Sequence, residues 1–292
     1  MINVKFISPY SNWDWLRQTS ASKGIWGNCH FFLDNEERQY DFLVVYNDLL
    51  ITENIRCAPE NTILVIGEPP TLKKYNQSFI NQFNTVITCF NESIKCRDVI
   101  FSQPLLPWLI GGKFIRESHK WACEFGKSYD ELCNIKGNEK TKELSIIIST
   151  KNNSSGHILR LDFIKKLKNH FKNRLDIFGV GFNEIVDKWD GIAPYKYCLA
   201  IENSSIKDYW TEKLSDIILS GSYPFYYGCP NISEYFPENS MTVIDINDSE
   251  EAIRLIENTI LIEQFEKSKE KIMHAKNLIL NKYNLFAVLS DI

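Results

Sequence analysis

The chain has 292 residues, of which 44% are hydrophobic and 24% charged, and its formal net charge is -4. This composition is ordinary for a globular protein, and the length is sufficient for two domains with separate cores. A net negative chain with a pI of about 5.8 lacks the basic surface needed to follow a phosphate backbone, which disfavours nucleic acid as the partner.

Four short apolar runs in the first third of the chain are predicted strands: Val4–Ile7, Phe42–Tyr46, Thr62–Ile66 and Thr85–Cys89. The stretches between them are long enough for helices or irregular crossovers. Strands that alternate with such spacers predict a parallel sheet covered on both faces. Residues 1–112 are therefore expected to form a first α/β domain that ends near a Gly-Gly pair. Residues 113–143 are more polar and less periodic, and are predicted to be a linker.

The segment Ser145–Gly179 has the pattern of a βαβ unit: an apolar run, a polar loop, an amphipathic basic helix and a second apolar run. It opens a second predicted α/β domain, residues 144–277. Arg160 lies at the start of the helix, ahead of several lysines. A basic helix face is usually only solvated. A planar guanidinium at this place can also bind a diphosphate through two parallel hydrogen bonds.

The apolar run Tyr197–Ile201 is predicted to be a strand buried on both faces. Glu202 and Asn203 stand at its carboxyl end, and Ser204 follows. In open α/β sheets, ligands bind beyond the carboxyl ends of the strands. Asn and Ser are also common turn residues, so a simple turn is the alternative, and the neighbouring carboxylate favours a binding role.

An amphipathic helix is predicted after this loop, with Asp208 as a candidate N-cap and Gly221 as its end. Its apolar side is formed by residues at helical spacing: Leu214, Ile217 and Ile218. The segment Ser222–Tyr227 reads as the next strand. Lys213 falls in the first turn of the helix, where the helix dipole disfavours a cation. A bound anion explains this position better than a surface ion pair does.

The segment Tyr195–Asp245 resembles the donor-binding half of the alpha-1,3-fucosyltransferases. In that family the motif reads approximately YKFxLAxENS, a short spacer, DYxTEK, a helix and a strand of the type AxPVxxG. This sequence agrees at Tyr195, Lys196, Leu199, Ala200, Glu202, Asn203, Ser204, Asp208, Tyr209, Thr211, Glu212, Lys213, Pro224 and Gly228. It departs in the strand, where SYPFYYG carries aromatic residues in place of small aliphatic ones. The resemblance covers about half the chain, from roughly Leu144 to the end.

The resemblance implies two Rossmann-like α/β domains that face each other across a cleft, the arrangement called GT-B. Residues 278–292 are then expected to form a C-terminal helix that crosses back to the first domain. The implied reaction is inverting transfer of fucose from GDP-fucose to a hydroxyl of an oligosaccharide or glycolipid acceptor, in protein glycosylation or surface polysaccharide biosynthesis. Two alternatives stay open: a different nucleotide sugar as donor, or a glycan- or nucleotide-binding protein without catalysis.

The resemblance also assigns roles to individual residues. Arg160 aligns with an arginine that contacts the donor diphosphate. A carboxylate such as Glu212 is favourable at a helix start on structural grounds alone. The resemblance implies that this carboxylate binds the ribose hydroxyls of the nucleotide. Tyr209 matches a contact residue, whereas Trp210 is expected in the core. The expected donor-binding residues are Arg160, Glu202, Asn203, Ser204, Tyr209, Glu212 and Lys213.

Glu68 is the candidate catalytic base in the first domain. It ends the run TILVIGE and is followed by two prolines, and a carboxylate held rigidly in this way suits a general base. The pair Gly67–Glu68 resembles the Gly-Glu pair whose carboxylate deprotonates the acceptor hydroxyl in the family. A solvent-exposed Glu at a strand end is the alternative.

Aromatic residues in the first domain suggest where an acceptor binds, since aromatic faces suit sugar rings. Asp14 lies between Trp13 and Trp15, and Trp108 lies between Pro and Gly residues. Asp14 and Trp108 are the acceptor-binding candidates. Packing explains Trp108 equally well.

Several signatures are missing from the sequence. It has no Asp-x-Asp pair, no GxGxxG after a strand and no GxxxxGK[ST], so we expect a metal-independent enzyme without a cofactor. Eight cysteines without a CxxC pair read as free thiols of a reducing compartment. With no signal peptide and no long apolar stretch, the chain resembles a soluble bacterial or viral relative of cytoplasmic location, and peripheral membrane contact stays open.

Overall fold

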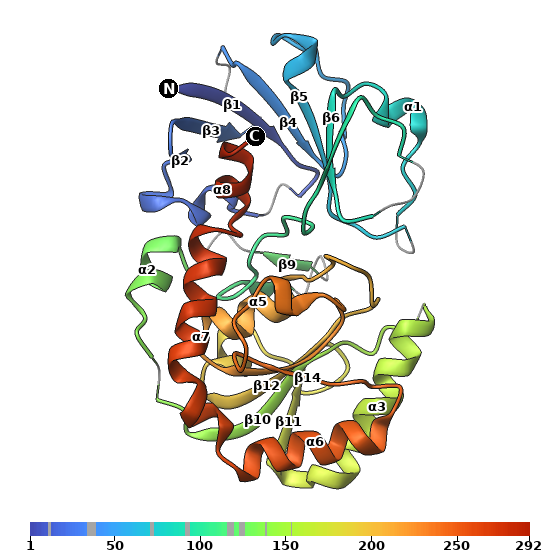
Figure 1. The fold of residues 1–292 in the computed structure, drawn as a ribbon, viewed down its shortest axis with the longest axis vertical. Helices are drawn as coiled ribbons and strands as arrows, with labels where there is room; N and C mark the ends of the chain where they lie inside the picture. The colour runs from blue at the N-terminus through green and yellow to red at the C-terminus, as the bar shows by residue number, and fades with distance from the viewer. Residues whose placement is uncertain are drawn as a thin grey trace.

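The fold contains two parallel β-sheets stacked along the long axis of the molecule (Figure 1). It was obtained as a computed structural model. The structure describes residues 1–10, 13–33, 39–70, 73–90, 94–115, 120–122, 126–137, 139–152 and 154–292. The expected α/β class, with two parallel sheets in separate domains, is confirmed.

The first sheet has the strand order β2-β3-β1-β4-β5-β6-β7, and only β2 is antiparallel to its neighbour. Its strands are β1 (Ile2–Ile7), β2 (Ile25–Trp26), β3 (Cys29–Leu33), β4 (Phe42–Tyr46), β5 (Thr62–Ile66), β6 (Thr85–Thr88) and β7 (Asp98–Phe101). The central strands are continuous β-branched and apolar runs, and all five residues of β5 are buried. Such runs suit a parallel sheet with both faces covered. The short helix α1 (Gln77–Ile80) connects β5 to β6.

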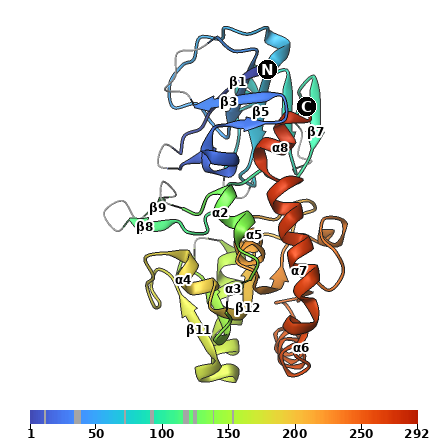
Figure 2. The same cartoon turned by 90° about the vertical axis from the view of Figure 1, so that its left-hand side faces the viewer.

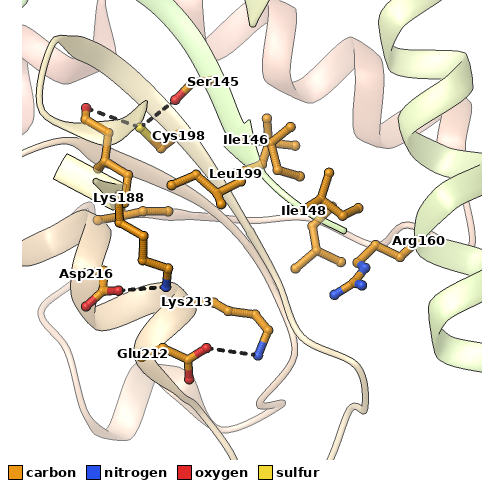
Figure 3. A pocket seen from close by; sticks show the side chains of 14 residues that line it. Ser145, Ile146, Ile148, Arg160, Lys188, Cys198, Leu199, Glu212, Lys213 and Asp216 are labelled. Carbon is orange, nitrogen blue, oxygen red and sulfur yellow. Dashed lines mark hydrogen bonds and ion pairs between the residues drawn. The ribbon is translucent and has the colours of Figure 1, made fainter. Parts of the chain in front are cut away.

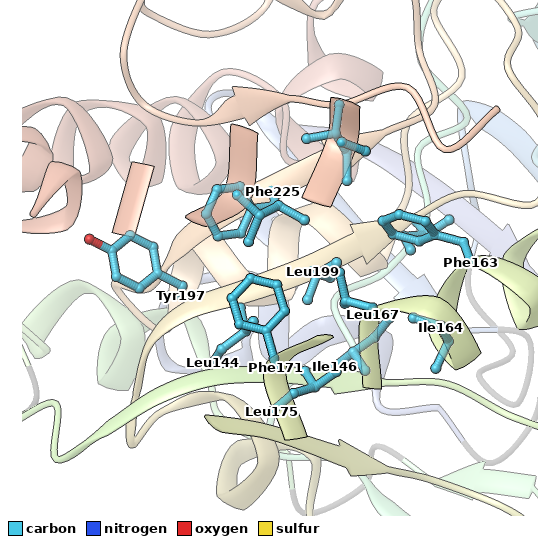
Figure 4. Packing of buried hydrophobic residues seen from close by; sticks show 14 of the residues in the cluster. Leu144, Ile146, Phe163, Ile164, Leu167, Phe171, Leu175, Tyr197, Leu199 and Phe225 are labelled. Atoms are coloured by element: carbon cyan, nitrogen blue, oxygen red, sulfur yellow. The ribbon is translucent and has the colours of Figure 1, made fainter. Parts of the chain in front are cut away.

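The second sheet is entirely parallel and has the order β11-β10-β12-β13-β14. Its strands are β10 (Lys142–Ile147), β11 (Leu175–Phe178), β12 (Tyr195–Ile201), β13 (Tyr223–Tyr227) and β14 (Thr242–Val243). Its helices are α3 (Ser155–Phe171), α4 (Lys188–Ile192), α5 (Glu212–Leu219) and α6 (Ser249–Leu261). The apolar side chains of α3 pack against β10, β12 and β13 on one face of this sheet (Figure 4). Helix α5 packs on the other face.

The chain passes from one core to the other between Leu105 and Trp108. Leu105 belongs to the apolar cluster of the first sheet, and Trp108 belongs to the cluster of the second. The ribbon β8 (Lys113–Ile115) and β9 (Lys120–Ala122) and the helix α2 (Tyr129–Asn134) lie between the two sheets in sequence.

The C-terminal helices run back along the molecule towards the first sheet (Figures 1 and 2). Helix α7 (Gln264–Asn281) contacts α5 of the second domain, and α8 (Leu285–Ser290) follows it. Leu285 and Phe286 of α8 are buried in the same cluster as β1 and β4. Asn284 caps α8 and donates to the backbone oxygen of Gln18. The end of the chain therefore ties the two domains together.

The crossover between the domains is held from both sides by buried polar groups. Arg17 of the first domain donates to the backbone oxygens of Trp108 and Lys127. On the other side, Asp216 of α5 is fully buried, and its Oδ1 accepts the backbone N–H groups of Leu109 and Ile110 at 2.9 and 3.0 Å. Its Oδ2 lies 3.0 Å from Nζ of Lys188. Both oxygens of this buried carboxylate have hydrogen-bonding partners. Asp216 therefore fixes α5 against the crossover segment.

We expect the Asp216→Ala variant to lose about 3–5 kcal/mol of unfolding free energy, because it removes the buried carboxylate that pairs with Lys188 and accepts from two backbone N–H groups. Urea unfolding followed by tryptophan fluorescence measures this loss. Asp162→Ala is the matched control: its side chain is 59% exposed, so the change there should stay within about 0.5 kcal/mol. Equal stability of the two variants would contradict this role of Asp216.

Candidate active site

The start of α5 is organised by Thr211, not by Asp208. Thr211 has an extended backbone, and its side chain accepts from the backbone N–H of Lys213 at 3.3 Å. Asp208 has a left-handed backbone with φ 63°, and its Oδ1 accepts from the side chains of Asn231 and Tyr235. The predicted N-cap role of Asp208 is therefore wrong, because its carboxylate is turned towards Asn231. Gly221, also with positive φ, follows the helix end as predicted.

Lys213 is held at the first turn of α5 by two carboxylates. Its Nζ lies 3.0 Å from Oε2 of Glu202 and 3.6 Å from Oε1 of Glu212. Glu202 also accepts from the backbone N–H and the hydroxyl of Thr211, each at 2.9 Å. Its side chain has no exposed surface. In this structure Glu202 is thus the anion that offsets the unfavourable position of Lys213 at the start of the helix. Its contact is with Lys213, and its side chain has no surface open to a ligand.

Arg160 and Asn203 meet beside this pair. Nη1 of Arg160 donates to Oδ1 of Asn203 at 2.7 Å. Helix α3 approaches so closely that a Cβ on Gly156 would lie 2.1 Å from the backbone oxygen of Asn203, so only glycine fits there. Nε of Arg160 and Nδ1 of His157 are buried and have no hydrogen-bond partner within the described part of the chain. Buried polar atoms are normally hydrogen-bonded, so these two nitrogens are candidate contacts for a ligand. His157 is a residue that sequence reasoning missed.

A small cavity of about 30 Å³ lies between α3, α4, α5 and the sheet (Figure 3). Five charged residues line it: Arg160, Lys188, Glu212, Lys213 and Asp216. Figure 3 shows the Lys188–Asp216 and Lys213–Glu212 pairs side by side, with Arg160 across from them. Burial alone would raise the pKa of Glu212, but the charges of Lys213 and Lys188 lower it, so this carboxyl is ionised. Lys188 was also missed, since nothing in its sequence neighbourhood signals a partner in α5.

Glu68 lies at the carboxyl end of β5, where a hydrogen-bond network fixes the strand end. The Tyr10 hydroxyl donates to its Oε1 at 3.4 Å. The backbone N–H of Gly67 donates to Oδ1 of Asn47 at 2.7 Å, and Asn47 Nδ2 donates to the Tyr10 oxygen. A Cβ on Gly67 would lie 2.4 Å from the Tyr46 hydroxyl, so this strand end requires glycine. The side chain of Glu68 is consequently presented at a defined place.

The Glu68 carboxylate faces α5 across the domain boundary. Burial raises its pKa, the charge of Glu212 raises it further, and Lys213 and the Tyr10 hydrogen bond lower it, with a net upward shift. A cleft of about 590 Å³ opens beside Glu68, with Lys73 among its lining residues. A half-buried carboxyl of raised pKa next to a cleft is a typical candidate for proton transfer.

The remaining predicted residues lie at different depths. Tyr209 is buried against Phe90 of the first domain, with ring centroids 5.8 Å apart, and so joins the two domains. Ser204 is half-buried in the loop after β12. Trp108 is only 2% exposed and packs in the core of the second domain, which corrects its expected acceptor contact. Asp14 is half-buried, and burial raises the pKa of its carboxyl.

An aromatic cleft of about 440 Å³ lies on the other side of Tyr10. The rings of Tyr10 and Trp13 are stacked at 4.4 Å, and Trp15 and Leu49 also line the cleft. Tyr10 lines this cleft and its hydroxyl donates to Glu68, so the cleft and the candidate base share one residue. The Trp-rich segment had signalled such a surface, whereas Tyr10 itself was missed.

Comparisons with known proteins identify the second half of the chain. Residues 137–274 match the model of "Glycosyltransferase family 10 (fucosyltransferase) C-term". The chain is 42% identical over 53 residues to GDP-fucose protein O-fucosyltransferase 3 of Xenopus tropicalis, which is 18% of this chain and 11% of that protein. It is 28% identical over 110 residues to Alpha-(1,3)-fucosyltransferase B of Drosophila melanogaster, which is 32% and 24% of the two chains. The matched segments therefore cover at most a quarter of the length of these two relatives.

The fold comparison extends over the whole chain. The crystal structure of an alpha1,3-fucosyltransferase with GDP-fucose aligns with 96% of this chain and 90% of that one, at 16% identity and a TM-score of 0.51. The same enzyme's structure with GDP gives a TM-score of 0.50. The overall fold is thus that of a GT-B glycosyltransferase. The family model matches just under half of the chain, and the matched segment contains Arg160, Glu202 and Lys213. This match supports the resemblance to the alpha-1,3-fucosyltransferase family that the sequence motifs indicate.

Proposed function

We propose that this protein is an inverting glycosyltransferase that moves fucose from GDP-fucose to a hydroxyl of an oligosaccharide or glycolipid acceptor. The observation that carries the proposal is the meeting of two charge systems across the domain boundary. Glu68 comes from the first domain, and its pKa responds to Glu212 and Lys213 of the second. A base and an anion-binding group on opposite sides of one site are what a single displacement requires.

The donor is proposed to bind at the carboxyl end of β12. Arg160 has a buried unpaired Nε, and with Lys213 it would hold the diphosphate. Nδ1 of His157, at the start of α3, is a further buried nitrogen without a partner among the described residues. Glu212 is ionised, which suits acceptance of the ribose hydroxyls. The relatives with GDP-fucose in their names or structures support this donor.

In the proposed reaction, Glu68 accepts the proton of the acceptor hydroxyl. The hydroxyl oxygen forms a bond to the anomeric carbon on the face opposite the diphosphate, and the bond from that carbon to the phosphate oxygen breaks. The leaving diphosphate keeps the electron pair, and Arg160 and Lys213 stabilise its charge. Attack from the opposite face inverts the configuration at carbon.

The acceptor is proposed to reach Glu68 along the cleft of Tyr10 and Trp13, because stacked aromatic faces bind sugar rings. Another nucleotide sugar would use the same diphosphate contacts and remains the alternative donor. A non-catalytic binding protein is disfavoured by Glu68, whose raised pKa and fixed position serve no purpose in binding alone.

Arg160→Ala and Lys213→Ala should each weaken GDP binding by about 1.5–3 kcal/mol, since each removes a charge-assisted hydrogen bond to phosphate. Titration calorimetry of the folded variants measures the effect. Lys165→Ala is the matched control on the same helix as Arg160, because its side chain is 76% exposed and pairs with its helical neighbour Asp162. GDP affinity unchanged in both test variants would refute the diphosphate assignment.

Glu68→Gln should lower turnover by about two to four orders of magnitude, the usual contribution of a general base, and leave GDP affinity near that of the wild type. In the wild type, kcat/KM should rise with pH as Glu68 loses its proton, with a midpoint above that of an ordinary carboxyl group because burial and Glu212 raise its pKa. The rise should disappear in the Gln variant. Near-normal turnover of that variant would place the base elsewhere, and Asp14→Asn would be the next variant to measure.

Fucose transfer should continue in the presence of a chelator. Among the described residues, no group of three or more His, Cys, Asp or Glu side chains is placed to hold a metal ion, and Arg160 and Lys213 supply positive charge at the diphosphate. The measurement is the initial rate with and without EDTA. Complete loss of activity that manganese restores would show that a metal belongs in the site.

No described helix is long and apolar enough to cross a membrane.

A further inference from the structure

The donor site is electrically balanced without a ligand. Its buried cluster holds three cations, Arg160, Lys188 and Lys213, and three carboxylates, Glu202, Glu212 and Asp216. Lys188 and Asp216 form one pair at 3.0 Å. The other two carboxylates share Lys213, while the Arg160 guanidinium donates, among the described residues, to the neutral amide of Asn203.

A nucleotide sugar would disturb this balance. Each of its two phosphates has one ester bond and one anhydride bond, and so carries a single negative charge at neutral pH. In a largely buried site, added negative charge next to ionised carboxylates is unfavourable. The diphosphate can bind tightly only if a carboxylate gives up its contact with Lys213 or its own negative charge.

Glu202 is the carboxylate placed to do both. Its side chain is fully buried, whereas the side chain of Glu212 is 18% exposed and can be solvated. We propose that Glu202 is the resident counter-ion of Lys213, that the donor diphosphate takes its place, and that Glu202 binds one proton from solvent as this happens. The inference rests on the proposed function, because it needs a nucleotide sugar in this pocket.

The groups around Glu202 agree with this exchange. Lys213 and Glu212 face it from α5, Arg160 from α3, Tyr209 from the preceding loop, and Tyr226 and Cys229 from β13 and the turn after it. Burial raises the pKa of Glu202, and the charge of Lys213 is the largest influence that lowers it. When Lys213 turns to the diphosphate, that influence weakens and the pKa rises further.

Thr211 can hold the carboxyl group in either state. Its backbone N–H and hydroxyl both donate to the ionised form, with the hydroxyl 2.9 and 3.0 Å from the two oxygens. A threonine hydroxyl also accepts a hydrogen bond, so a protonated Glu202 can donate to the same atom. The loop before α5 therefore need not move when the proton is taken up.

The test is titration calorimetry of the whole protein with GDP-fucose and no acceptor. GDP-fucose is preferred to GDP because a terminal phosphate itself titrates near about pH 6. Binding heats in two buffers of very different ionisation enthalpy should show uptake of about one proton near neutral pH. The affinity should fall by up to about tenfold per pH unit as the pH rises.

Two variants separate Glu202 from its neighbour. Glu202→Gln keeps the shape and removes the titrating group, so proton uptake should fall by about one proton relative to the wild type, the pH dependence should weaken accordingly, and affinity at about pH 8.5 should equal or exceed that of the wild type. A purely structural role would instead weaken binding at every pH. Glu212→Gln is the matched control, and it should weaken binding but retain the proton uptake.

The possible outcomes are distinct. Wild-type binding of GDP-fucose with no proton uptake and no pH dependence would overturn the inference and leave the proposed function intact. Proton uptake as large in a folded Glu202→Gln variant as in the wild type would also overturn it. Absence of GDP-fucose binding by the wild type at any pH would overturn both. Should the Gln variant fail to fold, the wild-type measurement alone decides.

Discussion

The buried carboxylate of Asp216 is the contact on which the site depends. It joins the backbone of the crossover segment to the middle of α5, and the residues at the start of that helix are Glu212 and Lys213. The crossover segment is also held by Arg17 and Gln18 of the first domain. Glu68, the proposed base, belongs to that first domain, and buried hydrogen bonds through the crossover segment connect this domain to the helix that carries the proposed donor-binding residues. A site divided between two domains needs such a connection, because reacting groups must be placed to within a fraction of an ångström.

A second connection lies directly at the site. The loop after β12 begins with Glu202 and Asn203 and inserts Tyr209 into the apolar cluster of the first sheet, next to Phe90. The same loop thus contacts Lys213 through Glu202 near its start and the first domain through Tyr209 near its end. Tyr209 had been expected to contact the donor. Its burial gives it a role in domain contact, which the matching sequence motif alone does not reveal.

Local pattern was enough to predict the parallel sheets, and the rule that ligands bind at strand ends singled out Glu202 and Asn203, whereas the family resemblance singled out Arg160. Local sequence pattern could not reveal contacts between residues that are far apart in the chain. The N-cap prediction at Asp208 failed because Asn231 and Tyr235 bind its carboxylate, and both are more than twenty residues away. Lys188 and Tyr10 were missed for the same reason, since their partners Asp216 and Glu68 lie 28 and 58 positions along the chain. Trp108 was ambiguous because an aromatic residue between Pro and Gly fits a cleft as well as a core.

The pKa of Glu68, the proposed base, depends on charged residues of the proposed donor site. Glu212 raises the pKa of Glu68 and Lys213 lowers it, although these residues come from different domains. A bound diphosphate would draw on the charge of Lys213 and add negative charge nearby, and both effects raise the pKa of Glu68 towards neutrality. General-base catalysis is most effective when the pKa of the base lies near the working pH. Donor binding would therefore bring Glu68 closer to that optimum before the acceptor arrives, without a change in the network of Tyr10, Gly67 and Asn47 that positions it.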